Sequence, residues 1–157
     1  MKIVLLSVGK TDNIHFAELI EAYLKRVNFY IPFEMIIVPD PKNRKNISEG
    51  EQKIAESSLL LKTLQPADHV VLLDDKGKQY TSTEFALYIE KKKHSVPKRL
   101  VFVVGGPYGF SQEMYAAANE KISLSRMTFT HQMVRLIFIE QLYRAMTIIN
   151  NEPYHHE

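Results

Sequence analysis

The stretch RLVFVVGGPYGFSQEMYAAANEKISLSRMTFTHQMVRLIFIEQLYR, residues 99–144, decides the fold and contains a candidate binding loop. It begins with a continuous apolar run, Leu100–Val104, which is typical of a strand buried on both faces. A strand that breaks into glycines and then enters a helix lets a ligand approach the main chain closely, because free N–H groups point at it. Three of the chain's six glycines follow the run in this way: Gly105, Gly106 and Gly109.

Two other interpretations of this glycine loop exist. Gly-Gly-Pro-Tyr-Gly can be no more than a tight connection between a strand and a helix, since glycine and proline are ordinary turn residues. A dinucleotide-binding loop is disfavoured, because the stretch is not a G-x-G-x-x-G fingerprint and lies far from the first strand. A ligand loop and a plain turn therefore both stay open at this point.

The composition is that of a single soluble domain, residues 1–157. Of these residues 45% are hydrophobic and 24% are charged, which is ordinary for a globular protein that buries a core. There is no cysteine, which excludes disulfides, thiolate chemistry and cysteine-based zinc sites. The N-terminus lacks the features of a signal peptide, and no apolar run reaches the length of a membrane span. We therefore expect a cytoplasmic protein with no membrane partner.

The net charge of +2 indicates that any basic surface must come from local clusters. Three clusters lie at 42–45, 91–93 and 98–99. Each is a candidate contact for RNA, and each is equally well explained as a solvated loop or helix end.

Strands and helices alternate along the whole chain. Two capping boxes, Ser48 with Glu51 and Thr81 with Glu84, predict helix starts, and the first of these helices is expected to face inward through apolar residues that include Ile54. The alternation predicts an α/β fold with a mostly parallel sheet flanked by helices, in which ligands bind beyond the carboxyl ends of the strands. The predicted strands are 2–8, 33–38, 69–73, 100–104 and 121–124, and the predicted helices are 16–27, 48–64, 81–93, 112–118 and 131–150.

The last predicted helix is apolar around nearly all of its circumference, so it must be buried on more than one side. One face can pack on the sheet. A second copy of the chain in a two-fold dimer would bury the other face, although burial within one subunit is the alternative.

Several segments together resemble the SPOUT-class family that methylates N3 of pseudouridine in 23S ribosomal RNA. They are KIVLLSVGK, PFEMIIVPD, VVLLDDKGK, VFVVGGPYGF, SLSRMTFTHQMVRLIFIEQLYRA and EPYHHE, so the resemblance spans essentially the whole chain. It implies a SPOUT fold with a C-terminal trefoil knot, a homodimer, and 23S rRNA in the ribosome as the partner. We expect an assembled particle rather than a short RNA as the substrate, because the chain has no separate RNA-binding domain.

The resemblance also implies S-adenosyl-L-methionine as the cofactor. Its site falls on the ends of three predicted strands, although each apolar residue there can equally belong to the core. The implied cofactor-binding residues are Leu73, Gly105, Leu124, Ser125, Arg126, Met127, Thr128 and Phe129.

Three residues are candidates for the catalytic side of the site: His131, Arg135 and Tyr154. His131 follows the cofactor loop, and an imidazole can take up the imide proton near neutral pH; a purely local hydrogen bond is the alternative. Arg135, with Arg126 and Arg144, is a candidate for holding RNA phosphate, although Arg144 can instead pair with Glu140.

Tyr154 lies in a tail that the resemblance assigns to the substrate side, where its ring can stack on the target base, and a frayed tail is the alternative. The adjacent histidines of the tail lack a third spaced ligand, so we expect no metal site.

One departure from the family pattern is Thr130, which stands where proline is common; its hydroxyl can still cap the following helix. The competing function is a non-catalytic RNA-binding module with the same fold.

Overall fold

Five strands form one parallel sheet in the order β2–β1–β4–β3–β5. The computed structural model describes residues 1–42 and 46–156, so part of the basic cluster at 42–45 lies outside the described residues. The predicted α/β fold with a parallel sheet is confirmed, whereas the trefoil knot stays a prediction. The strands are β1 (Lys2–Val8), β2 (Phe33–Val38), β3 (Asp68–Gln79), β4 (Arg99–Val104) and β5 (Glu120–Ser123).

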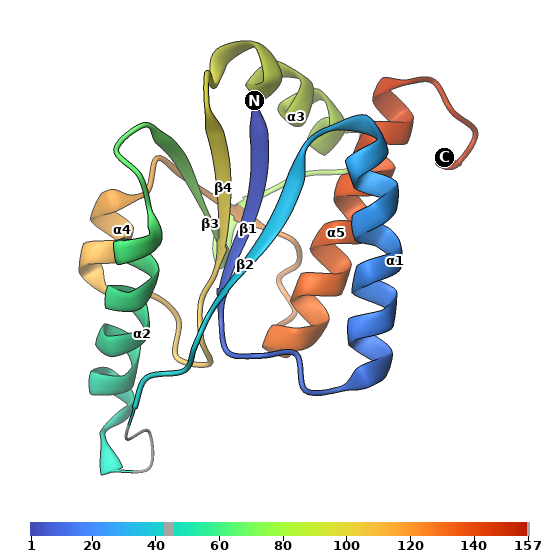
Figure 1. Ribbon diagram of the computed structural model, residues 1–157. Coiled ribbons are helices and arrows are strands. Elements are labelled where there is room, and N and C mark those ends of the chain that lie inside the picture. Colours follow the sequence, from blue (N-terminus) through green and yellow to red (C-terminus); the bar gives the residue numbers. More distant parts are fainter. Residues whose placement is uncertain (43–45, 157) are drawn as a thin grey trace.

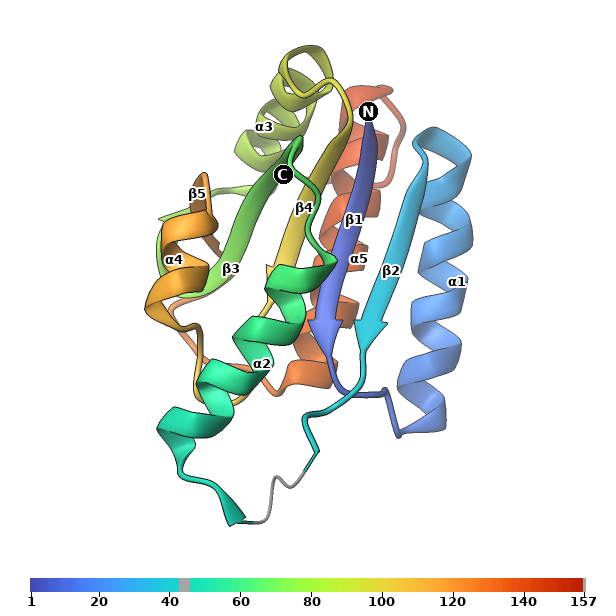
Figure 2. The same cartoon turned by 60° about the vertical axis from the view of Figure 1, so that its left-hand side comes forward.

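Helices cover both faces of the sheet (Figures 1 and 2). One face carries α1 (Ile14–Tyr30), α3 (Ser82–Ser95) and α5 (His131–Ile149), and the other carries α2 (Glu49–Thr63) and α4 (Gln112–Ala117). The two predicted capping boxes are present at the starts of α2 and α3. The sheet therefore lies between two helical layers, and both of its faces are buried.

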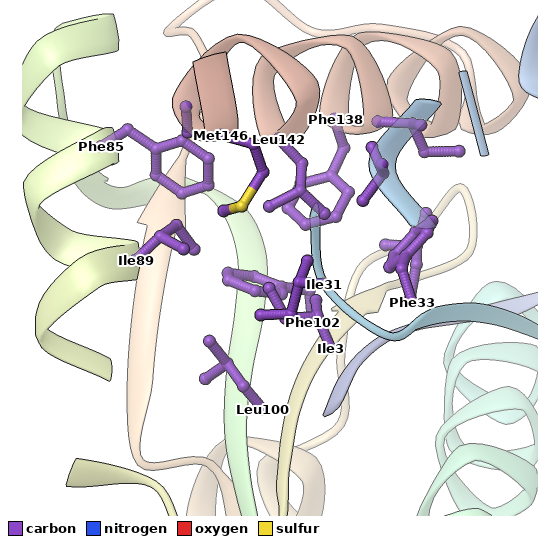
Figure 3. Packing of buried hydrophobic residues seen from close by; sticks show 14 of the residues in the cluster. Ile3, Ile31, Phe33, Phe85, Ile89, Leu100, Phe102, Phe138, Leu142 and Met146 are labelled. Carbon is purple, nitrogen blue, oxygen red and sulfur yellow. The ribbon is translucent and has the colours of Figure 1, made fainter. Parts of the chain in front are cut away.

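Alternate side chains of the central strands enter the two cores. Leu100 and Phe102 of β4 pack in the larger core with Phe138 of α5 (Figure 3), where the rings of Phe102 and Phe138 lie 4.7 Å apart. Val101 and Val103 face α2 and α4 instead. This division explains why the predicted strand at 100–104 is apolar at every position.

Two predictions about these elements are wrong. Ile54 of α2 was expected to face inward, but it is 57% exposed, and Leu60 takes the buried position. The third strand was expected to end at residue 73, but β3 continues to Gln79 after a register shift between Leu73 and Lys78. Gly77 allows this continuation, because a Cβ there would lie 2.5 Å from the carbonyl carbon of Ile122.

The last helix packs on the sheet and lies between α1 and α3. Phe138, Ile139 and Leu142 are fully buried, whereas Met133 is 37% exposed and Ile137 is half-buried. Most of the helix is therefore enclosed within one chain, and a few apolar side chains on its remaining side stay partly exposed.

Candidate functional site

A cleft of about 1070 Å³ opens where β4 and β5 end and where β3 shifts its register after Leu73. Its walls come from residues 73–76 of β3, the glycine loop after β4, the loop after β5 and the start of α5. The parallel strands bring these segments together at one edge of the sheet, as expected for an α/β fold. Eight of the predicted site residues line this one cleft: Leu73, Gly105, Leu124, Ser125, Met127, Thr128, Phe129 and His131.

The glycine loop forms the floor of the cleft. Its tight turn is closed by a hydrogen bond of 3.1 Å from the Gly109 N–H to the Gly106 carbonyl. Gly109 has a φ of +78°, a conformation that favours glycine, and a Cβ on Gly105 would lie 3.1 Å from the Phe110 ring. The loop is thus a tight turn and also a surface of the cleft, and its role as a ligand loop stays a prediction.

The loop after β5 is ordered by its own serines. The Ser123 hydroxyl donates to the Ser125 carbonyl, and the Ser125 hydroxyl accepts from the Met127 N–H at 2.9 Å. Met127 is 76% exposed and Phe129 is 41% exposed, so two large apolar side chains stand at the cleft without covering protein. Arg126 directly precedes Met127 in the sequence, but it is exposed and does not line the cleft.

A carboxylate and a phenol that the sequence did not single out face each other on the cleft wall. The Tyr115 hydroxyl donates to the Asp74 carboxylate, which also accepts from the Lys76 N–H at 2.8 Å. Burial opposes ionisation of Asp74, but these hydrogen bonds outweigh it and lower its pKa. Burial and the bond to Asp74 raise the pKa of Tyr115 to about 12. Asp74 therefore presents a negative charge to the cleft at neutral pH.

His131 stands at the first turn of α5, at the rim of the cleft. The Thr130 hydroxyl caps this helix by accepting from the Met133 N–H at 3.3 Å, so the expected cap is present without proline. The helix N-terminus carries a partial positive charge from its unpaired N–H groups. The site thus places an imidazole and a positive helix end side by side.

Arg135 does not present its guanidinium to the surface, contrary to the expectation that it holds RNA phosphate. It is fully buried and donates to the carbonyls of Val8 and Gly9 at 2.6 and 2.8 Å and to the Thr11 hydroxyl at 3.0 Å. Burial lowers its pKa, while Asp40 and Asp12 act in the opposite direction. Arg135 therefore ties the end of β1 to α5, because buried carbonyl groups need donors.

The cleft includes the start of α5, whereas Tyr154 lies in the tail after the end of this helix, and Figure 1 shows that tail at the opposite end of α5 from its start. Helix α5 separates them, and its 19 residues span about 28 Å. The tail is held in place, because the Tyr154 ring lies 4.7 Å from that of Tyr143 and its hydroxyl bonds to Glu140 at 3.1 Å. Burial and the hydrogen bonds to Tyr23 and Glu140 raise the pKa of Tyr154, so its hydroxyl stays protonated.

Arg144 pairs with Glu140 at 2.5 Å, the alternative that the sequence left open for it, and also lies over the Tyr154 ring.

Neither a metal-binding cluster nor a membrane-spanning helix occurs in the described residues, 1–42 and 46–156. Within them, no three His, Cys, Asp or Glu side chains gather closely enough to hold a metal ion. No helix in this part of the chain is long and apolar enough to cross a membrane.

Comparison with known proteins gives a family and full-length relatives. The family model described as "Predicted SPOUT methyltransferase" matches residues 1–155. A protein of Parabacteroides distasonis named "Ribosomal RNA large subunit methyltransferase H" is 66% identical over 157 residues, and one of Phocaeicola vulgatus with the same name is 58% identical; each pair is covered over 100% of both chains.

The solved structure of a probable methyltransferase from Bordetella pertussis matches with a TM-score of 0.52 at 10% identity, over 92% of this chain and 93% of that one, which shows similarity of fold alone.

Proposed function

Because the chain belongs to the SPOUT methyltransferase family, we propose that it is an S-adenosylmethionine-dependent enzyme that methylates N3 of a pseudouridine in 23S rRNA, acting as one domain over residues 1–157. The observation that carries the proposal is the convergence of the ends of three strands on one cleft, with Leu73, Gly105 and the 124–129 loop in its walls. The name that the full-length relatives share supports RNA of the large ribosomal subunit as the substrate.

The lining of the cleft fits this cofactor. Leu124, Met127 and Phe129 offer apolar surface for the adenine ring, and Gly105 and Gly106 line the cleft with main chain. Asp74 gives the cleft a negative charge, which attracts the positively charged sulfonium and amino groups. The site thus combines an apolar wall, a main-chain surface and two carboxylates, Asp74 and Asp75, with Lys53 and Lys76 also in its lining.

Bound S-adenosylmethionine supplies an activated methyl group, whose S–CH₃ bond breaks as the N3–CH₃ bond forms, leaving S-adenosylhomocysteine and releasing the imide proton. The residues of the chain remove the imide proton and align the two reactants. His131 at the rim of the cleft takes up the imide proton, and the positive end of α5 stabilises the imide anion. Alignment of the two reactants in the cleft supplies effective molarities on the order of 10⁵ M or more.

The substrate side of the site needs a second copy of the chain. The Tyr154 tail lies at the far end of α5 from its own cleft, so it can reach a cleft only on a partner. The remaining side of α5, with partly exposed Met133, is a suitable contact for that partner. We place Tyr154 of one copy over the cleft of the other in a homodimer that works on the assembled ribosome in the cytoplasm.

The proposal is tested by transfer of labelled methyl from S-adenosylmethionine to ribosomes whose target pseudouridine is unmethylated. Ribosomes with uridine at that position are the control. We expect label at N3 only when pseudouridine is present. If the protein binds the cofactor but transfers no label, the proposed substrate is wrong. If it binds no cofactor, the proposal that it is an S-adenosylmethionine-dependent enzyme is wrong. Efficient methylation of a naked RNA hairpin would contradict the assembled ribosome as the substrate.

A further inference from the structure

A buried carboxyl group lies directly beneath the glycine loop. Glu56 of α2 is 1% exposed, and its Oε1 accepts a hydrogen bond of 2.9 Å from Gln52. Its Oε2 has no hydrogen-bond partner among residues 1–42 and 46–156. Buried polar atoms are nearly always paired, so an unpaired carboxyl oxygen behind a ligand cleft requires a functional explanation.

The carboxyl group of Glu56 explains why position 106 is glycine. A Cβ on Gly106 would lie 1.9 Å from Oε2 of Glu56, far inside any allowed contact. Gly106 does not have the positive φ that favours glycine, unlike Gly109. The requirement for glycine at 106 therefore comes from the side chain of Glu56 and not from the backbone conformation.

The next residue of α2 holds the other end of the same loop. The Ser57 hydroxyl accepts from the Ser111 N–H at 3.0 Å, and both groups are buried. Helix α2 thus contacts the loop at Gly106 through Glu56 and at Ser111 through Ser57. The cleft-lining residues Pro107, Tyr108 and Gly109 lie between these two contacts.

We propose that Glu56 is a positioning residue for the cofactor loop, and that its Oε2 accepts a hydrogen bond from the main-chain N–H of Gly106 or Tyr108 when the cofactor binds. This inference rests on the proposed function. Glu56 does not line the cleft and touches no reacting atom, so it acts on cofactor affinity and not on the methyl transfer step. The unpaired Oε2 of Glu56 is the acceptor that this bond uses.

The first test is Glu56→Gln, with S-adenosylmethionine titrated calorimetrically. Glutamine has a single acceptor oxygen, so it cannot serve both Gln52 and the loop. We expect the cofactor Kd to rise roughly 10-fold, because one buried hydrogen bond is no longer formed. The kcat at saturating cofactor should change less than about two-fold. Hydrogen exchange at the amides of Gly106 and Tyr108 in the cofactor-bound state should be faster than in the wild type.

Glu49→Gln, at an exposed carboxyl group on the same helix, is the matched control and should bind as the wild type does. Wild-type affinity in Glu56→Gln overturns the inference, and so does a Glu56→Gln protein that does not fold, because Glu56 would then serve the fold. If the wild type itself binds no S-adenosylmethionine, it is the proposed function that fails.

The second test uses the close contact between Gly106 and the carboxyl group of Glu56. Gly106→Ala should lose cofactor binding, because its Cβ meets the carboxyl group of Glu56. Gly106→Ala combined with Glu56→Ala removes the clash and should bind more tightly than Gly106→Ala alone, although more weakly than the wild type. A double variant no better than Gly106→Ala overturns the contact on which the inference depends.

Discussion

Hydrogen bonds between polar residues around the cleft stabilise its walls. The bond from Tyr115 to Asp74 makes this stabilisation depend on pH. Tyr115→Phe should lower the free energy of unfolding by about 1.5 kcal/mol at pH 7, since a hydrogen bond to a charged group is lost. The pKa of Asp74 is lowered from 3.8, so this contribution exists above pH 4 and disappears as the pH falls through the lowered value.

The pKa of Tyr115 is raised from 10.0 to about 12, so the same contribution declines as the pH rises from 10 to 12. Urea unfolding across this range measures both limits. Tyr108→Phe, at a hydroxyl that is more exposed, is the control. A Tyr115→Phe protein whose stability deficit is the same at pH 2 and pH 7 would contradict the assignment.

Arg135 is a structural residue in this account and not a contact for RNA. Arg135→Met should lower the free energy of unfolding by about 3 kcal/mol, because the buried carbonyl groups of Val8 and Gly9 lose their donor. Arg126→Met, at an exposed side chain, should change it by less than about 0.5 kcal/mol. Unchanged stability with lost ribosome binding in Arg135→Met would restore the phosphate role that the sequence suggested.

His131 is assigned the imide proton, so His131→Gln should lower kcat by roughly 10²-fold or more. Cofactor affinity should be unchanged, because the role concerns only the proton. The measurement is single-turnover methyl transfer on ribosomes together with a cofactor titration. His15→Gln, at an exposed histidine outside the cleft, should be as active as the wild type. Full activity of His131→Gln would leave this histidine with a purely local role.

Helix N-termini are the elements through which local sequence affects the site. Thr130→Ala and Ser48→Ala should each lower the free energy of unfolding by about 1 kcal/mol, because each removes an N-cap. Only Thr130 lies at the cleft, so only Thr130→Ala should also weaken cofactor binding. Thermal unfolding and cofactor titration of both variants separate the two effects. Equal cofactor affinity in the two variants would contradict a role of the α5 start in the site.

Local signals predicted these elements well, and they failed where a distant contact decides the structure. The capping boxes at Ser48 and Thr81 are confirmed because both partners lie within one turn of helix. The inward face of α2 was mispredicted because it carries polar residues, Glu56 and Ser57, that contact the glycine loop. Apolar periodicity therefore pointed to Ile54. The extension of β3 was missed because its pairing with β5 follows a polar, charged segment.

At the scale of the whole molecule, the cleft and the tail lie at opposite ends of α5. The sequence predicted the convergence of Leu73, Gly105 and the 124–129 loop, because the carboxyl ends of parallel strands meet at one edge of a sheet. The predicted helix 131–150 also implies that Tyr154 is far from its own cleft, because the helix starts beside the cofactor loop and its length separates the two. This separation is why the account requires two copies of the chain for one site.

Methyl transfer by mixed dimers tests this central claim most directly. Gly105→Val damages the cleft and Tyr154→Ala damages the tail, so each homodimer should be inactive. When both are co-expressed, about half of the dimers are mixed, and each mixed dimer has one intact site of two, which predicts roughly one quarter of wild-type activity. An inactive mixture, formed from chains that fold and dimerise, would contradict a site shared between two copies.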